Sequence, residues 1–263
     1  MKISIITITY NSEKTLEETI LSVKAQKYQE IEYLIIDGGS TDRTLEIVKK
    51  YPDVVTKWIS EPDKGISDAF NKGINLASGE LIGIINSDDL LTDNSLAIIA
   101  ENINDDTDVV YGNAIMFGND EAPYRLRPFG DLKEFYKLMA VIHPATFVKK
   151  NAYTKYGLFK LDYKCCMDRE LLLRMFSQGA KFQYIDSDLA KMRLGGVNQR
   201  TYLKTTITEG TTISIDYGMN PLVAKAIEIK KNIRFRVVYF VRKFPFATIL
   251  RRVIHSRNTE LNI

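Results

Sequence analysis

The sequence predicts an α/β protein with a doubly wound, mostly parallel sheet and helices on both faces. Three observations indicate this class. Short apolar runs rich in β-branched residues recur, as in residues 3–8 and 81–85, and such runs are typical of strands covered on both faces. Stretches with apolar residues at helical spacing alternate with these runs. Polar and acidic residues follow the strands, at the edge where open parallel sheets bind ligands.

The first half of the chain alternates regularly between the two kinds of element. Leu16, Ile20 and Val23 follow the first strand at helical spacing, which predicts a helix there. We expect strands at residues 3–8, 31–36, 54–59 and 81–85, and helices at 13–27, 42–50, 66–77 and 95–103. Because crossovers between parallel strands are right-handed, few topologies fit this order.

The alternation becomes less regular after about residue 107. We expect strands at residues 109–117, 145–148, 181–185 and 188–194, and helices at 132–139, 168–177 and 201–217. The last forty residues are helical by pattern and amphipathic in part.

The charge of the chain is distributed unevenly. The net charge is +3, but residues 225–257 hold ten Lys and Arg against one acid, which leaves 26 basic and 32 acidic residues elsewhere. Aromatic side chains interleave with these basic residues, a pattern that suits an anionic lipid surface. It also suits packing against the domain with the basic side in water. We expect no nucleic acid partner.

The start of the chain predicts a protein of the cytoplasm. Met1 begins directly on a strand-like run, without the basic segment and cleavage site of a signal peptide. No uncharged apolar run reaches the length of a spanning helix. Cys165 and Cys166 are neighbours in sequence, and we expect two free thiols.

Acidic side chains follow the strands that we expect at the centre of the sheet. Asp88 and Asp89 come after the strand at 81–85. Holding two adjacent carboxylates close together is unfavourable, and Mg²⁺ or Mn²⁺ removes that penalty, filling its other positions with phosphate oxygens and water. The alternative is that the pair only begins a loop and caps a helix.

Asp37 and Asp168 are further candidates, each with a structural alternative. Asp37 precedes Gly38 and Gly39, and its carboxylate suits the N–H groups of uracil or guanine, although the segment also reads as a turn before a helix cap. Asp168 begins an amphipathic helix, where a carboxylate is favoured by the helix dipole; it is also well placed as a general base.

Two further features fit either a functional or a purely structural role. His143 precedes Pro144 and suits either a cleft or a satisfied structural histidine. Gly195-Gly196 suits a hairpin turn or a close approach to a ligand, with Arg193 contributing charge.

Five blocks in this order resemble the inverting family-2 glycosyltransferases of the GT-A fold, over about residues 1–200. They are Ile5-Ile6-Thr7-Ile8-Thr9-Tyr10-Asn11, Ile36-Asp37-Gly38-Gly39-Ser40-Thr41-Asp42, the segment from Ser60 to Gly73, Asn86-Ser87-Asp88-Asp89 in the place of the D-x-D signature, and Met167-Asp168-Arg169-Glu170. Within the family, the blocks are most similar to those of bacterial transferases that build exopolysaccharide, capsule or O-antigen.

The resemblance implies a role for each matching residue. Asp168 matches the catalytic base, and Asp88 matches the metal ligand of D-x-D. The implied nucleotide-sugar site consists of Thr9, Tyr10, Asn11, Asp37, Asp68, Lys72, Asn86, Ser87 and Asp88. Gly38 replaces a second aspartate that contacts uracil in many members, Asn86 replaces the first acid of D-x-D, and Met167 replaces an acid beside the base.

From these residues and the resemblance together we expect a metal-dependent, inverting glycosyltransferase. It would use a nucleoside-diphosphate sugar and Mn²⁺ or Mg²⁺, and act on a glycan or lipid-linked acceptor at the inner face of the cell membrane. A transferase domain is expected over residues 1–218, with a nucleotide-binding half of about 1–112 and an acceptor half of about 113–218, followed by a basic helical tail over 219–263.

Three other classes compete with this interpretation. A non-catalytic sugar-nucleotide binding module would be expected to lack Asp88 or Asp168, and both are present. A nucleotidyltransferase would normally carry a glycine-rich basic loop after the first strand. A dehydrogenase would show G-x-G-x-x-G at that place.

Overall fold

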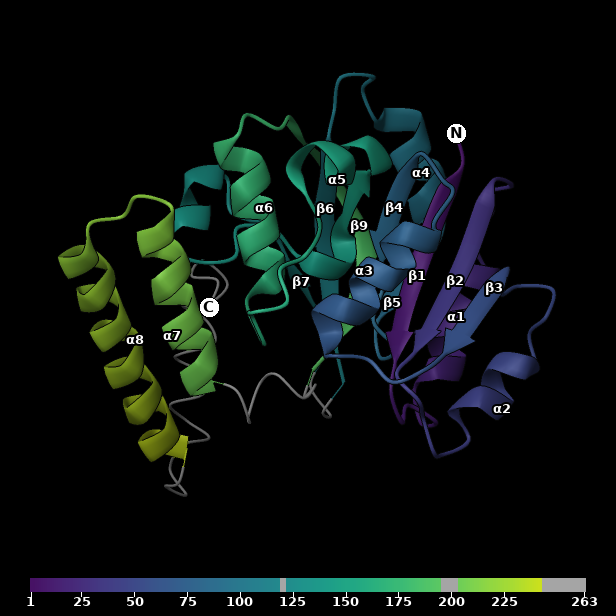
Figure 1. Ribbon diagram of the computed structural model, residues 1–263, viewed down its shortest axis with the longest axis horizontal. Helices are drawn as coiled ribbons and strands as arrows, with labels where there is room; N and C mark the ends of the chain where they lie inside the picture. Colours follow the sequence, from purple (N-terminus) through teal and green to yellow (C-terminus); the bar gives the residue numbers. More distant parts are fainter. Residues whose placement is uncertain (119–121, 195–202, 243–263) are drawn as a thin grey trace.

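The computed structural model describes residues 1–118, 122–194 and 203–242 (Figure 1). Within these residues one nine-stranded sheet has the order β3-β2-β1-β4-β8-β6-β9-β5, and β7 pairs with β6. Its strands are β1 (Ile3–Thr9), β2 (Ile31–Asp37), β3 (Lys57–Ser60), β4 (Leu81–Ile84), β5 (Leu90–Leu91), β6 (Val109–Phe117), β7 (Tyr124–Leu126), β8 (Thr146–Lys149) and β9 (Phe182–Arg193). The helices are α1 (Leu16–Lys24), α2 (Thr44–Lys49), α3 (Ile66–Leu76), α4 (Ser95–Asn102), α5 (Lys150–Tyr156), α6 (Met167–Ser177), α7 (Leu203–Asp216) and α8 (Pro221–Arg242), with 3-10 turns η1 (Leu132–Tyr136) and η2 (His143–Ala145).

The topology of the sheet places the switch point beside β1. This strand pairs in parallel with β2 on one side and with β4 on the other. The chain first winds outwards through β2 to β3, then crosses back to β4. The register sets Thr9 opposite Asp37, so the loops after β1, β2 and β4 leave the same edge of the sheet. Ligands bind at such an edge in open α/β sheets.

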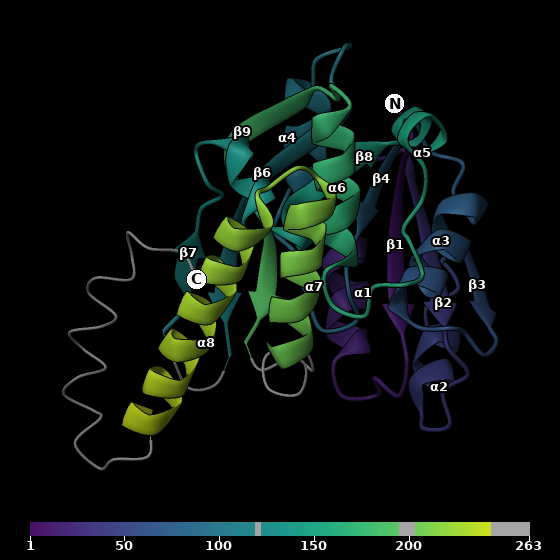
Figure 2. The ribbon, with the colours of Figure 1, turned by 60° about the vertical axis from the view of Figure 1, so that its left-hand side comes forward.

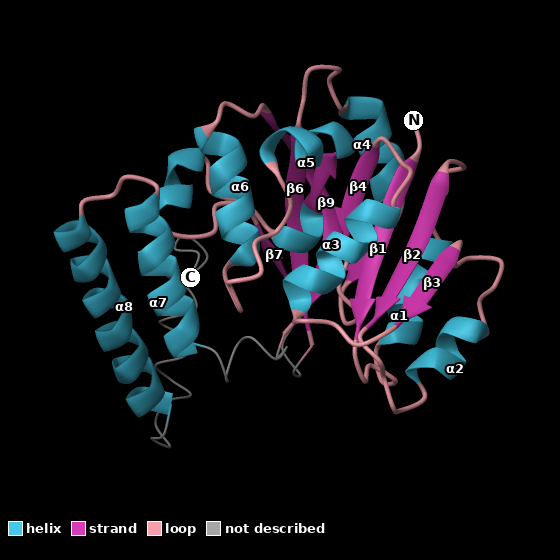
Figure 3. Cartoon of the chain, in the orientation of Figure 1, coloured by secondary structure: helices cyan, strands magenta, loops and turns pink. Residues whose placement is uncertain are grey.

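Helices cover both faces of the sheet, which confirms the predicted doubly wound fold (Figure 3). Successive residues of a strand point to opposite faces. Ile5 and Ile35 pack on the side of α1, α2 and α4, and Ile6 and Ile36 on the side of α3 and α6. These four side chains are at most 2% exposed. Both layers therefore bury a continuous apolar core against the strands that lead to the site.

The second half departs from the prediction in several elements. The strands expected at 181–185 and 188–194 form one strand, β9. Its pairing with β6 shifts register near Asn113, so the strand continues through the polar residues 186–187. Residues 132–136 form a 3-10 turn instead of a helix. The sequence analysis missed β5, β7 and α5.

The last two described helices lie side by side at the end of the molecule opposite β3 (Figures 1 and 2). The turn between them contains Gly218, whose φ of +94° lies in the left-handed region that favours glycine. Half of the predicted tail, residues 243–263, lies outside the described residues. In the part of the chain that the structure describes, no helix has both the length and the apolar character needed to cross a bilayer.

Candidate active site

The loops after β1 and β2 are joined by hydrogen bonds into one rigid rim. Asn11 has a φ of 49°, and its backbone N–H donates to Ser40 Oγ at 2.8 Å. Asn11 Oδ1 in turn accepts from the N–H of Thr41 at 2.9 Å. The ring of Tyr10 projects from this rim and is 63% exposed. Thr9, in contrast, is 4% exposed, and its hydroxyl has no hydrogen-bond partner among the described residues.

The carboxylate of Asp37 lies inside this rim and is only 1% exposed. One of its oxygens accepts from the N–H groups of Gly39 and Ser40 and from Ser60 Oγ, at 3.1, 2.9 and 2.6 Å, and the other accepts from Ser40 Oγ. A carboxylate has about four acceptor positions. Oδ1 keeps one acceptor position, but because the residue is almost fully buried, direct contact between Asp37 and a nucleobase, which the sequence predicts, would require the surrounding loops to move.

The two acids after β4 have different environments. Asp89 is 3% exposed and accepts from the N–H of Arg193 at 3.1 Å and from Asn86 Nδ2 at 3.3 Å. Burial, together with the charge of Asp88, raises the pKa of Asp89 to about 7. Asp88 is only half-buried, and its carboxylate accepts no hydrogen bond from any other described residue. Of the two, Asp88 is the acid that remains available to a ligand.

Arg193, at the end of β9, holds this acidic segment in place. Its Nε donates to the backbone oxygen of Asp88 at 3.2 Å, and its Nη2 forms an ion pair with Glu18 at 2.6 Å. The guanidinium lies 4.5 Å from the centre of the Phe117 ring. The sequence analysis noted Arg193 only as a companion of Gly195-Gly196, which lie outside the described residues. Its place at the end of a strand was the signal for a role in the site.

The first two residues of the predicted signature, Asn86 and Ser87, make local contacts. Asn86 donates to Asp89, and Ser87 Oγ lies 2.9 Å from Ser12 Oγ on the loop after β1. These contacts connect the β1 and β4 loops across the switch point. In the described structure Asn86 and Ser87 therefore support Asp88.

The single available carboxylate of Asp88 fits Mg²⁺ or Mn²⁺, which need few ligands from the protein. No group of three or more His, Cys, Asp or Glu side chains that could hold a metal occurs in the described ranges. Mg²⁺ and Mn²⁺ in phosphate sites typically take one or two carboxylates and fill their other positions with phosphate oxygens and water. Burial raises the pKa of Asp88, and a cation beside it would favour the charged form again.

Asp68 and Lys72 lie on the first turns of α3 and hold the preceding loop. Asp68 accepts from the N–H of Lys64 at 3.0 Å and pairs with Lys72 at 3.4 Å. Lys72 also pairs with Glu61 at 2.8 Å and donates to the oxygen of Pro62. The structure thus brings both residues to the edge of the sheet, where they fasten residues 61–65 onto α3.

Asp168 and His143 line a shared cavity between α6 and the sheet. Ile84, the last residue of β4, lies in the same wall, so the cavity adjoins the strand that leads to Asp88. His143 is half-buried, and its buried Nε2 has no hydrogen-bond partner among the described residues. Burial lowers the pKa of His143, while the charge of Asp168 acts in the opposite direction. The imidazole is therefore neutral at pH 7 and keeps an unused ring nitrogen.

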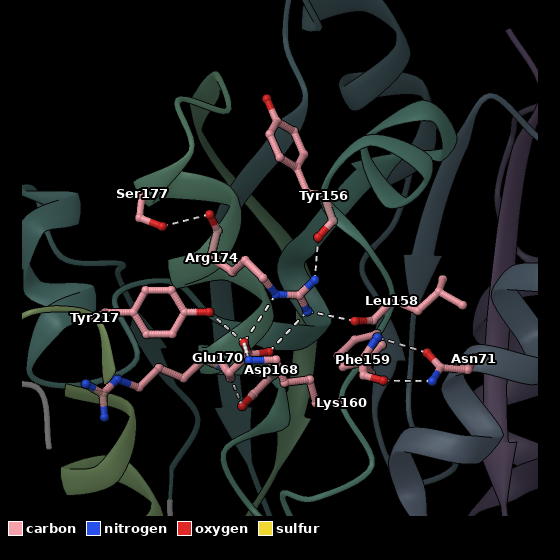
Figure 4. A network of polar contacts seen from close by, with 11 residues as sticks. Asn71, Tyr156, Leu158, Phe159, Lys160, Asp168, Glu170, Arg174, Ser177 and Tyr217 are labelled. Atoms are coloured by element: carbon pink, nitrogen blue, oxygen red, sulfur yellow. Dashed lines mark hydrogen bonds and ion pairs between the residues drawn. The ribbon is translucent and has the colours of Figure 1, made fainter. Parts of the chain in front are cut away.

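The position of Asp168 depends on a network around Glu170, one turn into α6 (Figure 4). The Glu170 side chain is fully buried and pairs with Lys160 at 2.7 Å and Arg174 at 3.1 Å. The hydroxyl of Tyr217 donates to it at 2.6 Å. Arg174 continues to the backbone oxygens of Tyr156 and Leu158. The network ties α6 to α5, to the following loop and to the end of α7.

Comparison with known proteins adds an independent observation. The model of the family described as Glycosyl transferase family 2 matches residues 4–171. An uncharacterised glycosyltransferase of Mycobacterium tuberculosis is 33% identical over 182 residues, covering 65% of this chain and 68% of the relative. A PGL/p-HBAD biosynthesis glycosyltransferase of Mycobacterium bovis is 31% identical over 183 residues, covering 67% and 70%.

Two solved structures resemble the fold. Residues 1–349 of Staphylococcus aureus TarS in complex with UDP-GlcNAc give a TM-score of 0.66 at 19% identity, covering 92% of this chain and 76% of that one. The mannosyltransferase PcManGT of Pyrobaculum calidifontis in complex with GDP-Man and Mn²⁺ gives 0.64 at 16% identity, covering 98% and 80%.

Proposed function

Because the chain belongs to glycosyltransferase family 2 and has the GT-A fold, we propose that it transfers a sugar from a nucleoside-diphosphate donor to an acceptor hydroxyl, with inversion at the anomeric carbon. The observation that carries the proposal is the carboxylate of Asp88. It lies half-buried and without a donor from any other described residue, at the switch point between β1 and β4. A diphosphate with a divalent cation fits that position.

On the donor side, Asp88 would hold Mn²⁺ or Mg²⁺, which would neutralise charge that develops on the departing diphosphate. PcManGT binds Mn²⁺ with GDP-Man, and this supports the choice of ion. Arg193 and the loop contacts of Asn86 and Ser87 keep the Asp88 segment in a fixed place. The rim that carries Tyr10 and Asn11 would contact the nucleoside.

On the acceptor side, Asp168 would remove the proton of the attacking hydroxyl. It is half-buried, and its Oδ1 accepts from the N–H of Arg169 at 2.7 Å. One oxygen thus accepts a backbone N–H in the first turn of α6, and Oδ2 has no hydrogen bond to a described residue. Both sequence interpretations of Asp168, helix cap and base, are compatible with this geometry.

The acceptor is proposed to be a glycan or lipid-linked glycan of the cell surface. Relatives named for PGL/p-HBAD biosynthesis support this class of acceptor. The transferase domain would end near residue 218, at the Gly218 turn, and α8 would lie beyond it against the inner face of the membrane. One side of α8 packs on α7 through Ala224, Ile227 and Lys231. The opposite side exposes Leu222, Ile229 and Ile233 by 81, 52 and 57%.

The proposal is tested by the release of nucleoside diphosphate from UDP-, GDP- and dTDP-sugars in the presence of Mn²⁺. Wild type should release nucleotide from at least one donor and bind it more tightly with Mn²⁺. Asp88→Ala should lose most of the metal-dependent part of the affinity in calorimetry, whereas Asp93→Ala, an exposed acid in the same segment, should not. Equal affinity with and without Mn²⁺ would refute the metal site. Binding without release from any donor would favour a non-catalytic binding module.

A further inference from the structure

We infer that Asp63 is the residue that recognises the nucleobase of the donor, by accepting the ring N–H of uracil, thymine or guanine; this rests on the proposed function. Asp63 belongs to the segment from Ser60 to Gly73, in which the resemblance implies roles only for Asp68 and Lys72. Asp63 follows β3, and the segment that carries it packs over the glycines after β2. Three contacts support the assignment.

The first contact is the close approach of Asp63 to Gly38. A Cβ added at Gly38 would lie 2.6 Å from Asp63 Oδ2 and 3.5 Å from Asp63 Cγ. Gly38 does not have a positive φ, so its backbone conformation does not require glycine. A Cβ at residue 38 would instead displace the Asp63 carboxylate, the end of a flexible side chain, from the space that it occupies. A side chain at residue 38 and the observed position of Asp63 exclude each other.

The second contact is the hydrogen bond from Gly65 to Asp63, which engages only one of the two carboxylate oxygens. Oδ1 accepts from the N–H of Gly65 at 2.8 Å, which fixes the side chain, while Oδ2 accepts no hydrogen bond within the described ranges. Asp37, the carboxylate that the sequence selected for the base, already accepts four hydrogen bonds and is only 1% exposed. Asp63 therefore presents the free carboxylate oxygen on this part of the rim.

The third contact supplies the surface for a flat ligand. Tyr10 Cδ2 lies 3.5 Å from the same added Cβ at Gly38, so an exposed aromatic ring, bare glycine backbone and a free carboxylate oxygen adjoin one another. A planar base could stack on Tyr10 and approach the backbone of Gly38 closely. Its edge would then face Asp63.

The chemistry of a carboxylate acceptor predicts which bases fit. Uracil and thymine carry a ring N–H between two carbonyl groups, and guanine carries a ring N–H beside an amino group. Cytosine and adenine have an unprotonated ring nitrogen at the corresponding edge, and its lone pair would repel Oδ2. The site should therefore select UDP, dTDP or GDP over CDP and ADP.

The first experiment measures the affinity of the full chain for these five nucleoside diphosphates with Mn²⁺ by calorimetry. Asp63→Asn keeps an oxygen for the Gly65 N–H but directs an amide N–H₂ towards the base. The dissociation constant of the best-bound nucleotide should rise about 10- to 100-fold, and its preference over CDP should shrink by the same factor. A purely structural effect would weaken all five nucleotides alike. Asp53→Asn, an exposed acid that precedes β3, is the matched control and should change neither value.

The second experiment moves the carboxylate to the other residue. Gly38→Asp alone should weaken binding, because the new side chain collides with Asp63. Asp63→Ala alone should also weaken it. The double variant Gly38→Asp with Asp63→Ala should bind the nucleotide at least tenfold more tightly than Asp63→Ala alone, because a carboxylate returns to nearly the same place.

The outcomes separate this inference from the function itself. Unchanged affinity and selectivity in Asp63→Asn, or a wild-type preference for CDP or ADP, would overturn the role of Asp63 while leaving a nucleotide-dependent enzyme. Wild-type protein that binds none of the five nucleotides would overturn both.

Discussion

At the scale of single residues, the state of each carboxylate oxygen distinguishes the acids that we propose as ligand-binding from the acid that its neighbours already engage. Asp37 ends β2, and Asp63 and Asp88 follow β3 and β4 of the same sheet, so all three lie along one edge. The sequence could not show which of them is free. The groups that donate to the Asp37 carboxylate include the hydroxyl of Ser60, 23 residues away. Hydrogen bonds over such a separation cannot be predicted from the local sequence.

Asp168→Asn tests the proposed base. The amide is nearly isosteric and can still accept from the N–H of Arg169, so α6 should keep its position. It cannot take up a proton, and general-base assistance contributes roughly 10²- to 10⁴-fold. We expect kcat to fall by about that factor with donor affinity unchanged, measured by steady-state transfer and by calorimetry. The control is Asp162→Asn, an exposed acid six residues earlier. Unchanged kcat in Asp168→Asn would contradict the assignment of Asp168 as the general base.

The lowered pKa of His143 predicts a dependence of stability on pH. Burial lowers its pKa from 6.5 in the folded protein, so below pH 6.5 the unfolded chain binds a proton that the folded chain does not. Folding stability should therefore fall as pH decreases from 6.5 towards 5, by at most about 1.4 kcal/mol per pH unit from this group. His143→Phe keeps a ring against Phe70 and removes the titration. Identical pH profiles of the unfolding midpoint for wild type and variant would contradict the prediction.

At the scale of elements, periodicity located the strands and helices of the first half well, and in the second half it located β6, β8, α6 and α7 but missed shorter elements. The first half consists of βα units whose apolar pattern reflects burial on both faces. Of the strands that were missed, β5 in the first half has two residues and β7 in the second half has three. Elements of this length show no period, and their pairing with β9 and β6 depends on residues far away in sequence. The break predicted at residues 186–187 is a register shift inside β9, which local sequence does not distinguish from a turn.

The position of α6 should depend on Glu170. Glu170→Ala would leave Arg174 and Lys160 without their shared partner, and breaking a buried ion pair from one side typically destabilises by about 3–5 kcal/mol. Because Lys160 is half-exposed and Arg174 keeps two backbone acceptors, we expect the lower end, about 3 kcal/mol. Denaturant unfolding measures it. Glu61→Ala removes an exposed pair with Lys72 and should change stability by less than about 1 kcal/mol. Equal effects of the two substitutions would show that the network does not hold α6.

At the scale of the whole molecule, the sequence predicted a basic appendage on an acidic body but left open whether it packs or binds a membrane. The structure shows that part of this segment packs. Arg169 is buried and donates to Gly210 and Ser214, which fixes α7 to α6, and α8 in turn contacts α7. Packing of one side of α8 does not exclude a membrane contact through the other. The exposed Leu222, Ile229 and Ile233 recur at seven and four residues, a spacing that places them on one helical face.

This face predicts binding to anionic lipid vesicles by the full chain. Lys225 and Lys230 flank the apolar residues and are exposed, so the helix offers an apolar stripe with basic edges, as interfacial helices do. Full-length protein should sediment with phosphatidylglycerol vesicles, and the attraction should weaken at high salt because basic residues contribute to it. Replacing Ile229 and Ile233 by Gln should reduce partitioning about tenfold or more, since each loses apolar surface that would enter the interface. Leu161→Gln removes a half-exposed leucine from a loop outside α8 and should leave partitioning unchanged. If the double variant bound vesicles as well as wild type, α8 would be a packing helix alone, and the acceptor would have to reach Asp168 without help from this surface.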